Sequence, residues 1–338
     1  MIKLLIGGSP CTHWSIAQRK NRETKAEGEG WELFLNYVIA KEKFKPDFFL
    51  YENNWSASKE IKEQIQKELG CELMRINSSL VSAQNRDRFY VFNWEVEQPE
   101  NRGILLKDIL ETGEDLLSND KSYCLTESYN RAIPLNTIER SQRSMVAKPI
   151  NCDVEALSND YYHGDSDNQL FGKIECKNTS NNGGQPAQGT RIYNTNCKSI
   201  CLDADSRKYI VDNFDARGYI KGLNKKIVPV YKVKDGMITI KDKIYPIKLN
   251  DGYYIIRKLT PVECERLQTM PDGYSAAVSN TQRYKCLGNG WTADVIIHIL
   301  QGILKDVPKN EKIVVLSMYD GIGTGRYCLD KMGFTNIE

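Results

Sequence analysis

The chain has 338 residues, of which 41% are hydrophobic, and a formal net charge of +2. This length and composition predict a chain that buries a sizeable core, in one large domain with a smaller second lobe. The apolar run at residues 2–6 is too short for a signal peptide or a membrane span, so the sequence argues against a membrane protein.

Ten cysteines are scattered along the chain, and none has the paired spacing of zinc ligands. They predict reduced thiols in a cytoplasmic protein, with no disulfide framework and no metal site.

Charge is distributed unevenly along the chain. Residues 206–248 hold eleven Lys and Arg against four Asp and Glu, whereas residues 151–170 hold five acids and no Lys or Arg. The basic segment is typical either of a polyanion-binding surface or of an ordinary solvated one.

The first hundred residues alternate between strand and helix patterns. A strand at residues 4–6 precedes a helix at residues 31–43, whose predicted apolar face holds Trp31, Phe34, Leu35, Val38 and Ile39. A strand at residues 48–52, a helix at residues 58–69 and strands at residues 71–79 and 88–94 follow. The alternation predicts an α/β fold with a parallel sheet.

From about residue 98 to residue 254, clusters of Gly, Asn and Ser break this pattern. The clearest element there is a hairpin in residues 230–249 that turns at Asp235 and Gly236. The stretch predicts a separate, loop-rich lobe.

Regular patterns return at Thr260, which with Pro261 and Glu263 has the pattern of a helix N-terminus with a capping box. A helix at residues 292–300 and a strand at residues 312–318 then lead into a glycine-rich loop.

That loop, "YDGIGTG", has glycines at 321, 323 and 325 between a strand and a helix pattern. Such a loop favours a nucleotide-like ligand lying against the backbone, although many are only tight turns. The spacing of these glycines differs from that of the dinucleotide-binding fingerprint. This difference favours an adenosine cofactor other than a dinucleotide.

Three further positions have chemical potential. Cys11 follows the first strand, where open α/β sheets bind their ligands, so it is either a nucleophile or a small buried residue. Glu52 ends the next strand at the same edge, either as an acid partner or as an exposed carboxylate. Arg86 and Arg88 lie two residues apart on a predicted strand, so their side chains share one side of it. Such a pair is typical of a site for an anion or a polar base edge, or of arginines that brace loops through carboxylates.

In combination these segments resemble the cytosine-C5 DNA methyltransferase family. The resemblance rests on "GGSPC", "ENN", "QNRDR", "RKLTPVECERLQTMPDGY", "LGNGW" and "SMYDGIGTG". It covers roughly residues 1–95 and 255–338, and its motif style is most similar to the animal de novo enzymes and their phage and bacterial relatives. The family implies a Rossmann-like, S-adenosylmethionine-dependent methyltransferase sheet with a smaller target-recognition lobe.

The resemblance also implies a mechanism. Cys11 would add to carbon 6 of a cytosine flipped out of double-stranded DNA, so that carbon 5 attacks the methyl group of S-adenosyl-L-methionine. Glu52 would bind the N3 and amine edge of the base, and Arg88 would hold its O2. Arg86 would support the loop that carries Cys11. The cofactor would contact Tyr319, Asp320, Gly321, Ile322, Gly323, Thr324, Asn289, Gly290, Trp291 and Gly8.

The family also implies a division of the chain. Residues 1–98 and 255–338 would form the catalytic domain, and the variable residues 99–254 the target-recognition lobe, which reads the major groove and contacts phosphates. The segment at residues 189–202, "GTRIYNTNCKSICL", would either sit near the DNA or pack within the lobe.

The order of the motifs differs from the family pattern, because the Pro-Cys loop comes first and the cofactor loop last. The segment that normally joins them, with acids for the ribose and the adenine, is absent, and Glu338 comes too early to replace it. We therefore expect a sheet that is incomplete at one edge, and either a longer chain or a second polypeptide that completes the cofactor site.

Two other functions stay open at this point. A non-catalytic DNA-binding homologue would keep the fold, although Cys11, Glu52, Arg86 and Arg88 together favour an enzyme. An RNA cytosine methyltransferase is the other alternative, and the long recognition lobe favours DNA. The target sequence and any accompanying restriction enzyme do not follow from the residues.

Overall fold

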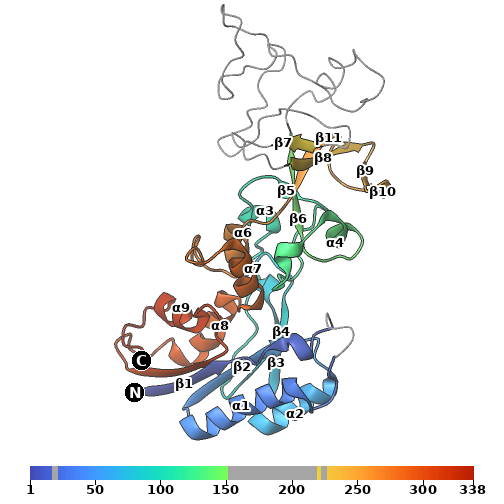
Figure 1. The fold of residues 1–338 in the computed structure, drawn as a ribbon. Coiled ribbons are helices and arrows are strands. Elements are labelled where there is room, and N and C mark those ends of the chain that lie inside the picture. The colour runs from blue at the N-terminus through green and yellow to red at the C-terminus, as the bar shows by residue number, and fades with distance from the viewer. Residues whose placement is uncertain (17–21, 151–218, 222–226) are drawn as a thin grey trace, which may run out of the picture.

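The computed structural model describes residues 1–16, 22–150, 219–221 and 227–338, and Figure 1 shows its two sheets and their helices. The first sheet has five strands in the order β12 (Ile313–Met318), β1 (Ile2–Gly7), β2 (Phe48–Asn54), β4 (Asp87–Phe92) and β3 (Leu73–Asn77). This arrangement confirms the α/β class.

The first sheet is mixed rather than wholly parallel as the sequence predicted. Strands β12, β1 and β2 are parallel, but β4 runs antiparallel to both β2 and β3. Only residues 78–86 separate β3 from β4, and they include the short helix η2 (Ser78–Leu80). A parallel crossover needs a dozen or more residues, so this connection allows only an antiparallel pair.

Helices cover both faces of this sheet. Helices α1 (Glu29–Phe44) and α2 (Lys59–Leu69) lie on one face, and α8 (Ala293–Leu304) and α9 (Thr324–Lys331) lie on the other (Figure 1). Alternate residues of β1 serve the two layers, because Leu5 packs in the core beside α1 and α2 whereas Leu4 and Ile6 pack in the core beside α8.

One residue of α1 departs from the predicted apolar face. Ile39 is 46% exposed, and the buried side chain in its neighbourhood is Tyr37. Tyr37 lies three residues after Phe34, and its ring stacks edge-on against Tyr51 of β2. The large aromatic therefore covers the sheet at this end of the helix, which leaves Ile39 on the solvent side.

The first and last strands of the chain, β1 and β12, pair with each other. Ile2 lies opposite Ile313 and Gly7 opposite Met318, in parallel register. Strand β12 ends the strand order of the sheet. Residues 336–338 nevertheless begin to pair with its outer side, since Ile313 N donates to Asn336 O at 2.9 Å and Val315 N donates to Glu338 O at 2.8 Å.

The second sheet is antiparallel throughout its described pairs. Its order is β10 (Lys243–Pro246), β9 (Met237–Ile240), β8 (Ile227–Lys234), β11 (Gly252–Lys258), β6 (Met145–Pro149) and β5 (Glu114–Asp115), and β7 (Tyr219–Lys221) pairs with β8. The predicted hairpin is confirmed as β8 and β9, and its turn residues have φ values of 53° at Asp235 and 70° at Gly236.

The described part of the predicted loop-rich lobe contains more regular strands than the hairpin that the sequence indicated. Buried and exposed residues do not alternate clearly along β10, because most residues of this strand are exposed. A strand of this kind has no hydrophobic periodicity that could be recognised from the sequence. Strand β11 crosses the expected boundary at residue 254, and the limits of the two lobes remain a prediction. The segment at residues 189–202 lies outside the described residues.

Short elements join the two sheets. They are α3 (Leu106–Ile109), η3 (Tyr129–Arg131), α4 (Pro134–Ile138), α6 (Pro261–Leu267) and α7 (Asn280–Asn289). The predicted capping box of α6 is confirmed, because Thr260 Oγ1 accepts from Glu263 N at 3.1 Å and Glu263 Oε2 accepts from Thr260 N at 2.7 Å. Among the described residues, no helix is long and apolar enough to cross a membrane.

Candidate active site

Cys11 begins a short helix, η1 (Cys11–His13), just beyond the end of β1. A buried hydrogen-bond cluster fixes the chain before it. Ser9 Oγ lies 2.7 Å from Tyr51 Oη, and Asn53 Nδ2 donates to Ser9 O at 2.9 Å and to Tyr51 Oη at 3.0 Å. Because Tyr51 and Asn53 both belong to β2, this cluster ties the Pro-Cys loop to the neighbouring strand.

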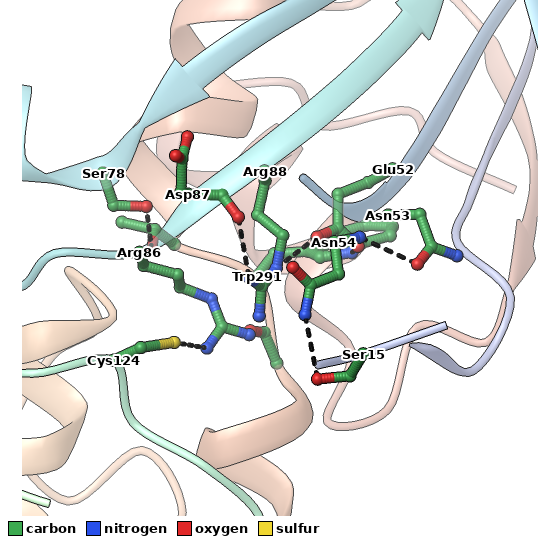
Figure 2. Close-up of polar contacts among 12 residues, drawn as sticks. Ser15, Glu52, Asn53, Asn54, Ser78, Arg86, Asp87, Arg88, Cys124 and Trp291 are labelled. Carbon is green, nitrogen blue, oxygen red and sulfur yellow. Dashed lines mark hydrogen bonds and ion pairs between the residues drawn. The ribbon is translucent and has the colours of Figure 1, made fainter. Parts of the chain in front are cut away.

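The residues after Cys11 are held to the same strand. The carbonyl of Cys11 accepts from the backbone amides of Trp14 and Ser15. Asn54 Nδ2 donates to Ser15 Oγ at 3.4 Å, as the dashed line in Figure 2 marks. The thiol is therefore presented from a turn that is anchored on both sides, which is the local requirement for a positioned nucleophile.

Glu52 and Arg88 meet on one face of the sheet. In the antiparallel pair of β2 and β4, Glu52 lies opposite Tyr90 and Asn54 lies opposite Arg88, so the carboxylate and the guanidinium are diagonal neighbours. Arg88 Nε donates to Glu52 Oε1 at 2.9 Å (Figure 2). The ion pair is largely buried, with side-chain exposures of 9% for Arg88 and 12% for Glu52.

Arg86 has partners different from the ones that the family resemblance implied. Its guanidinium donates to the carbonyls of Leu125 at 2.9 Å, Gly288 at 3.2 Å and Gly290 at 2.7 Å. Among the described residues, none of its hydrogen bonds reaches the loop that carries Cys11, so support of that loop by Arg86 stays a prediction. Arg86, the residue before β4, instead links the start of that strand to the end of α7 through these hydrogen bonds.

Two thiols lie near these charges. Burial raises the pKa of Cys11; Arg88 acts to lower it and Glu52 to raise it further. Burial also acts to raise the pKa of Cys124, but the guanidinium groups of Arg86 and Arg88 outweigh it, so this pKa falls below its ordinary value. Arg86 Nη1 lies 3.4 Å from Cys124 Sγ (Figure 2). The resting site thus favours a protonated Cys11.

The glycine loop follows β12, beside β1. Gly321 and Gly323 have positive φ values of 66° and 76°, and a Cβ at Gly321 would meet no atom within 4 Å. Asp320 Oδ1 accepts from Gly325 N at 2.8 Å, and burial raises the pKa of this carboxyl. Tyr319 is 41% exposed. Ile322 is half-buried, and its carbonyl accepts from Tyr274 Oη at 3.0 Å.

These residues suit the methionine end of S-adenosylmethionine. Thr324 Oγ1 is buried and has no hydrogen-bond partner among the described residues, so its hydroxyl can both donate to and accept from a ligand. It lies at the first position of α9, whose first backbone amides, those of Thr324 and Gly325, donate to the Asp320 carboxylate. The donor set and the open space at Gly321 therefore fit the cofactor that the sequence predicted.

The other predicted cofactor residues have mixed surroundings. Gly8 donates from its backbone to Met318 O at 3.4 Å, which joins the Pro-Cys loop to the end of β12. Asn289 is exposed, and Gly290 is buried with its carbonyl bound to Arg86. Trp291 is buried and donates to Glu52 Oε2 at 3.2 Å.

Sequence reasoning missed Ser9, Tyr51, Asn53 and Cys124 as residues of this site. Asn53 belongs to the "ENN" segment, so its position beside Glu52 was a usable signal. Cys124 had no such signal, because its place beside Arg86 depends on a long-range contact between separate segments.

The glycine loop follows β12, Cys11 follows β1, and Glu52 lies two residues before the end of β2, so the predicted site residues lie toward the carboxyl ends of three parallel neighbouring strands. That arrangement is consistent with the fold of an S-adenosylmethionine-dependent methyltransferase. A model of the family described as C-5 cytosine-specific DNA methylase matches residues 1–305, and the chain belongs to that family. It transfers a methyl group from S-adenosylmethionine to carbon 5 of cytosine in DNA.

Relatives come from phage, bacteria and a plant. An orphan methyltransferase of Bacillus phage SPR, M.SPRI, is 24% identical over 89% of this chain and 82% of its own length. The type II methyltransferase M.HgiCI of Herpetosiphon aurantiacus is 22% identical over the same shares. The DNA (cytosine-5)-methyltransferase DRM2 of rice is 35% identical over 78 residues, which are 23% of this chain and 13% of the rice protein.

Proposed function

We propose that Cys11 is the nucleophile that adds to carbon 6 of the target cytosine. The observation that carries this assignment is the anchored turn that presents Cys11 near the Glu52 and Arg88 pair. Because burial raises the pKa of this thiol, the proton must leave as the sulfur attacks. Arg88, which acts to lower this pKa, favours the developing thiolate.

Glu52 and Arg88 bind the base. The carboxylate accepts from the exocyclic amine and holds a proton at N3, while charge develops on the ring. Arg88 donates to O2 of the cytosine and keeps Glu52 in place through its Nε contact. Arg86 does not touch the base in this proposal; it holds the end of α7 beside the site.

The glycine loop holds the cofactor. Tyr319 would pack against the adenine, and residues 320–324 would hold the methionine end and the ribose, together with Asn289, Gly290 and Gly8. S-adenosylmethionine supplies an electrophilic methyl group when it is bound. The chain's own contribution is orientation, through the Asp320 carboxylate and the Thr324 hydroxyl, which has no partner within the part of the chain that the structure describes.

The substrate is a cytosine flipped out of duplex DNA in the cytoplasm of a bacterial or phage-infected host cell, at a cost of about a few kcal/mol of broken stacking and pairing. Sequencing host DNA for 5-methylcytosine after expression tests this function and gives the target sequence. Methyl transfer to a duplex that contains this sequence should exceed transfer to tRNA, and the reverse ratio would identify an RNA enzyme.

We expect the basic segment at residues 206–248 to bind DNA phosphates. Lys232 and Lys234 are exposed on the same side of β8, whereas Lys225 and Lys226 lie outside the described residues. Changing all four to Gln should weaken binding to every sequence and flatten the salt dependence, by about 0.9 in log-log slope for each phosphate that is no longer neutralised. Fluorescence anisotropy with labelled duplexes over a salt series measures the slope.

A variant that removes lysine charge from another surface serves as the control. Lys59→Gln with Lys67→Gln changes two exposed lysines of α2, which Figure 1 places at the end of the molecule away from β8. The salt slope of this control should stay at the wild-type value. An equal slope for the control and the fourfold variant would place the DNA elsewhere.

We also propose that a further strand continues the first sheet beyond β12. Residues 336–338 already pair with Ile313 and Val315, and half-buried Leu316 and Met318 continue the same strand. That strand would come from a continuation of the chain or from a second polypeptide, and would carry the acids for the ribose and the adenine.

Titration calorimetry tests this strand. S-adenosylmethionine should bind the 338-residue chain at least about tenfold more weakly than it binds the chain supplied with the additional segment, because two carboxylate hydrogen bonds are then restored. Tight binding by a well-behaved monomer of these 338 residues would show that the cofactor site is complete without it.

A further inference from the structure

Trp291 lies between α7 and α8 with its indole in the core. Its side chain is 5% exposed and belongs to the same cluster as Leu4, Ile6 and Leu50 of the sheet. A buried indole N–H needs an acceptor, because an unpaired donor in an apolar environment is costly. The acceptor is Glu52 Oε2, at 3.2 Å, and Figure 2 shows the two side chains side by side.

The carboxylate of Glu52 is therefore held from two elements. Arg88 of β4 binds Oε1 at 2.9 Å, and Trp291 binds Oε2. On a third side, a Cβ at Gly8 would lie 3.0 Å from Oε2 and 2.5 Å from the carbonyl oxygen of Glu52. Two donors and one close backbone leave the carboxylate a single orientation.

The indole can only donate, so it cannot exchange a proton with the base during the reaction. The indole can therefore fix the orientation of the carboxylate without taking part in proton transfer to or from the base. The remaining lone pairs of the Glu52 oxygens stay available for a base edge, since an ionised carboxylate accepts about four hydrogen bonds.

We propose that Trp291 is a positioning residue that acts through Glu52 in the methylation step, in addition to any contact with the cofactor. This inference rests on the proposed function of Glu52. In this proposal the rate of methylation depends on the indole N–H of Trp291 rather than on the surface of its ring.

Trp291→Phe removes the N–H and keeps an aromatic ring. The single-turnover rate of adduct formation with 5-fluorocytosine DNA should fall at least about tenfold, the effect of removing a hydrogen bond to a charged group. The Kd for S-adenosylmethionine should change less than about twofold. Trp94→Phe is the matched control, because the half-buried Trp94 packs against the same cluster and its N–H donates to Ile299 O at 2.9 Å, away from Glu52.

A double-mutant cycle with Glu52→Gln separates the possible outcomes. If Trp291 acts through Glu52, adding Trp291→Phe to the Glu52→Gln variant should slow the reaction much less than it slows the wild type. Equal slowing in both backgrounds, a rate unchanged by Trp291→Phe, or a loss confined to cofactor affinity would overturn the inference. Full activity of Glu52→Gln alone would instead contradict the proposed function of Glu52.

Discussion

Cys11→Ser should abolish the stable adduct between the protein and DNA and reduce methyl transfer roughly a thousandfold or more. A serine hydroxyl keeps the geometry of the anchored turn but is a far weaker nucleophile than a thiolate at neutral pH. The measurement uses duplex DNA in which 5-fluorocytosine replaces cytosine, because the fluorine blocks release of the covalent complex. Denaturing gel electrophoresis then counts the trapped protein.

The sharpest control is Cys124→Ser. Cys124 lies beside Arg86, and its pKa is lowered by both arginines, so acidity alone would favour it as the nucleophile. Cys124→Ser should retain the adduct, because the new hydroxyl can still accept from Arg86. Peptide mapping that places the adduct on Cys124, or a normal adduct with Cys11→Ser, would remove Cys11 from the mechanism.

The strand ends could be predicted from the sequence because each signal there is local. The apolar run before Gly7 and the Pro-Cys turn after it predict a strand with a residue at its carboxyl end, and the structure has β1 and η1 there. The same reasoning gave β2 and the position of Glu52. The capping box at Thr260 was equally local, since it needs only residues three apart.

The remaining features depend on contacts between distant segments. The antiparallel direction of β4 follows from the short β3 to β4 connection, which strand patterns taken one at a time do not reveal. The partners of Arg86 come from residues near 125 and 290, and periodicity says nothing about which loops those are. Arg86 and Arg88 lie only two residues apart but have different partners. Arg88 binds Glu52, whereas Arg86 binds the end of α7.

The contact between α7 and the loop at residues 126–127 requires a glycine, which has no side chain, at position 288. Gly288 lies in the last turn of α7, and a Cβ there would meet Thr126 C at 2.2 Å and Glu127 N at 2.3 Å. Both atoms are backbone, so no side chain can move aside to make room. The carbonyl of the same glycine accepts from Arg86, and Trp291 follows three residues later.

Gly288→Ala should therefore destabilise the protein, although alanine is ordinarily the better helix former by about 1 kcal/mol. Overpacking against backbone costs about 1–3 kcal/mol or more, and the shift of α7 should also move Trp291 away from Glu52. We expect a lower urea midpoint, and a fall in adduct formation beyond the unfolded fraction. Gln282→Ala, at an exposed position of the same helix, should change neither quantity. A Gly288→Ala protein with wild-type stability and rate would mean that α7 and residues 126–127 can separate without moving Trp291, and that the base site does not depend on this contact.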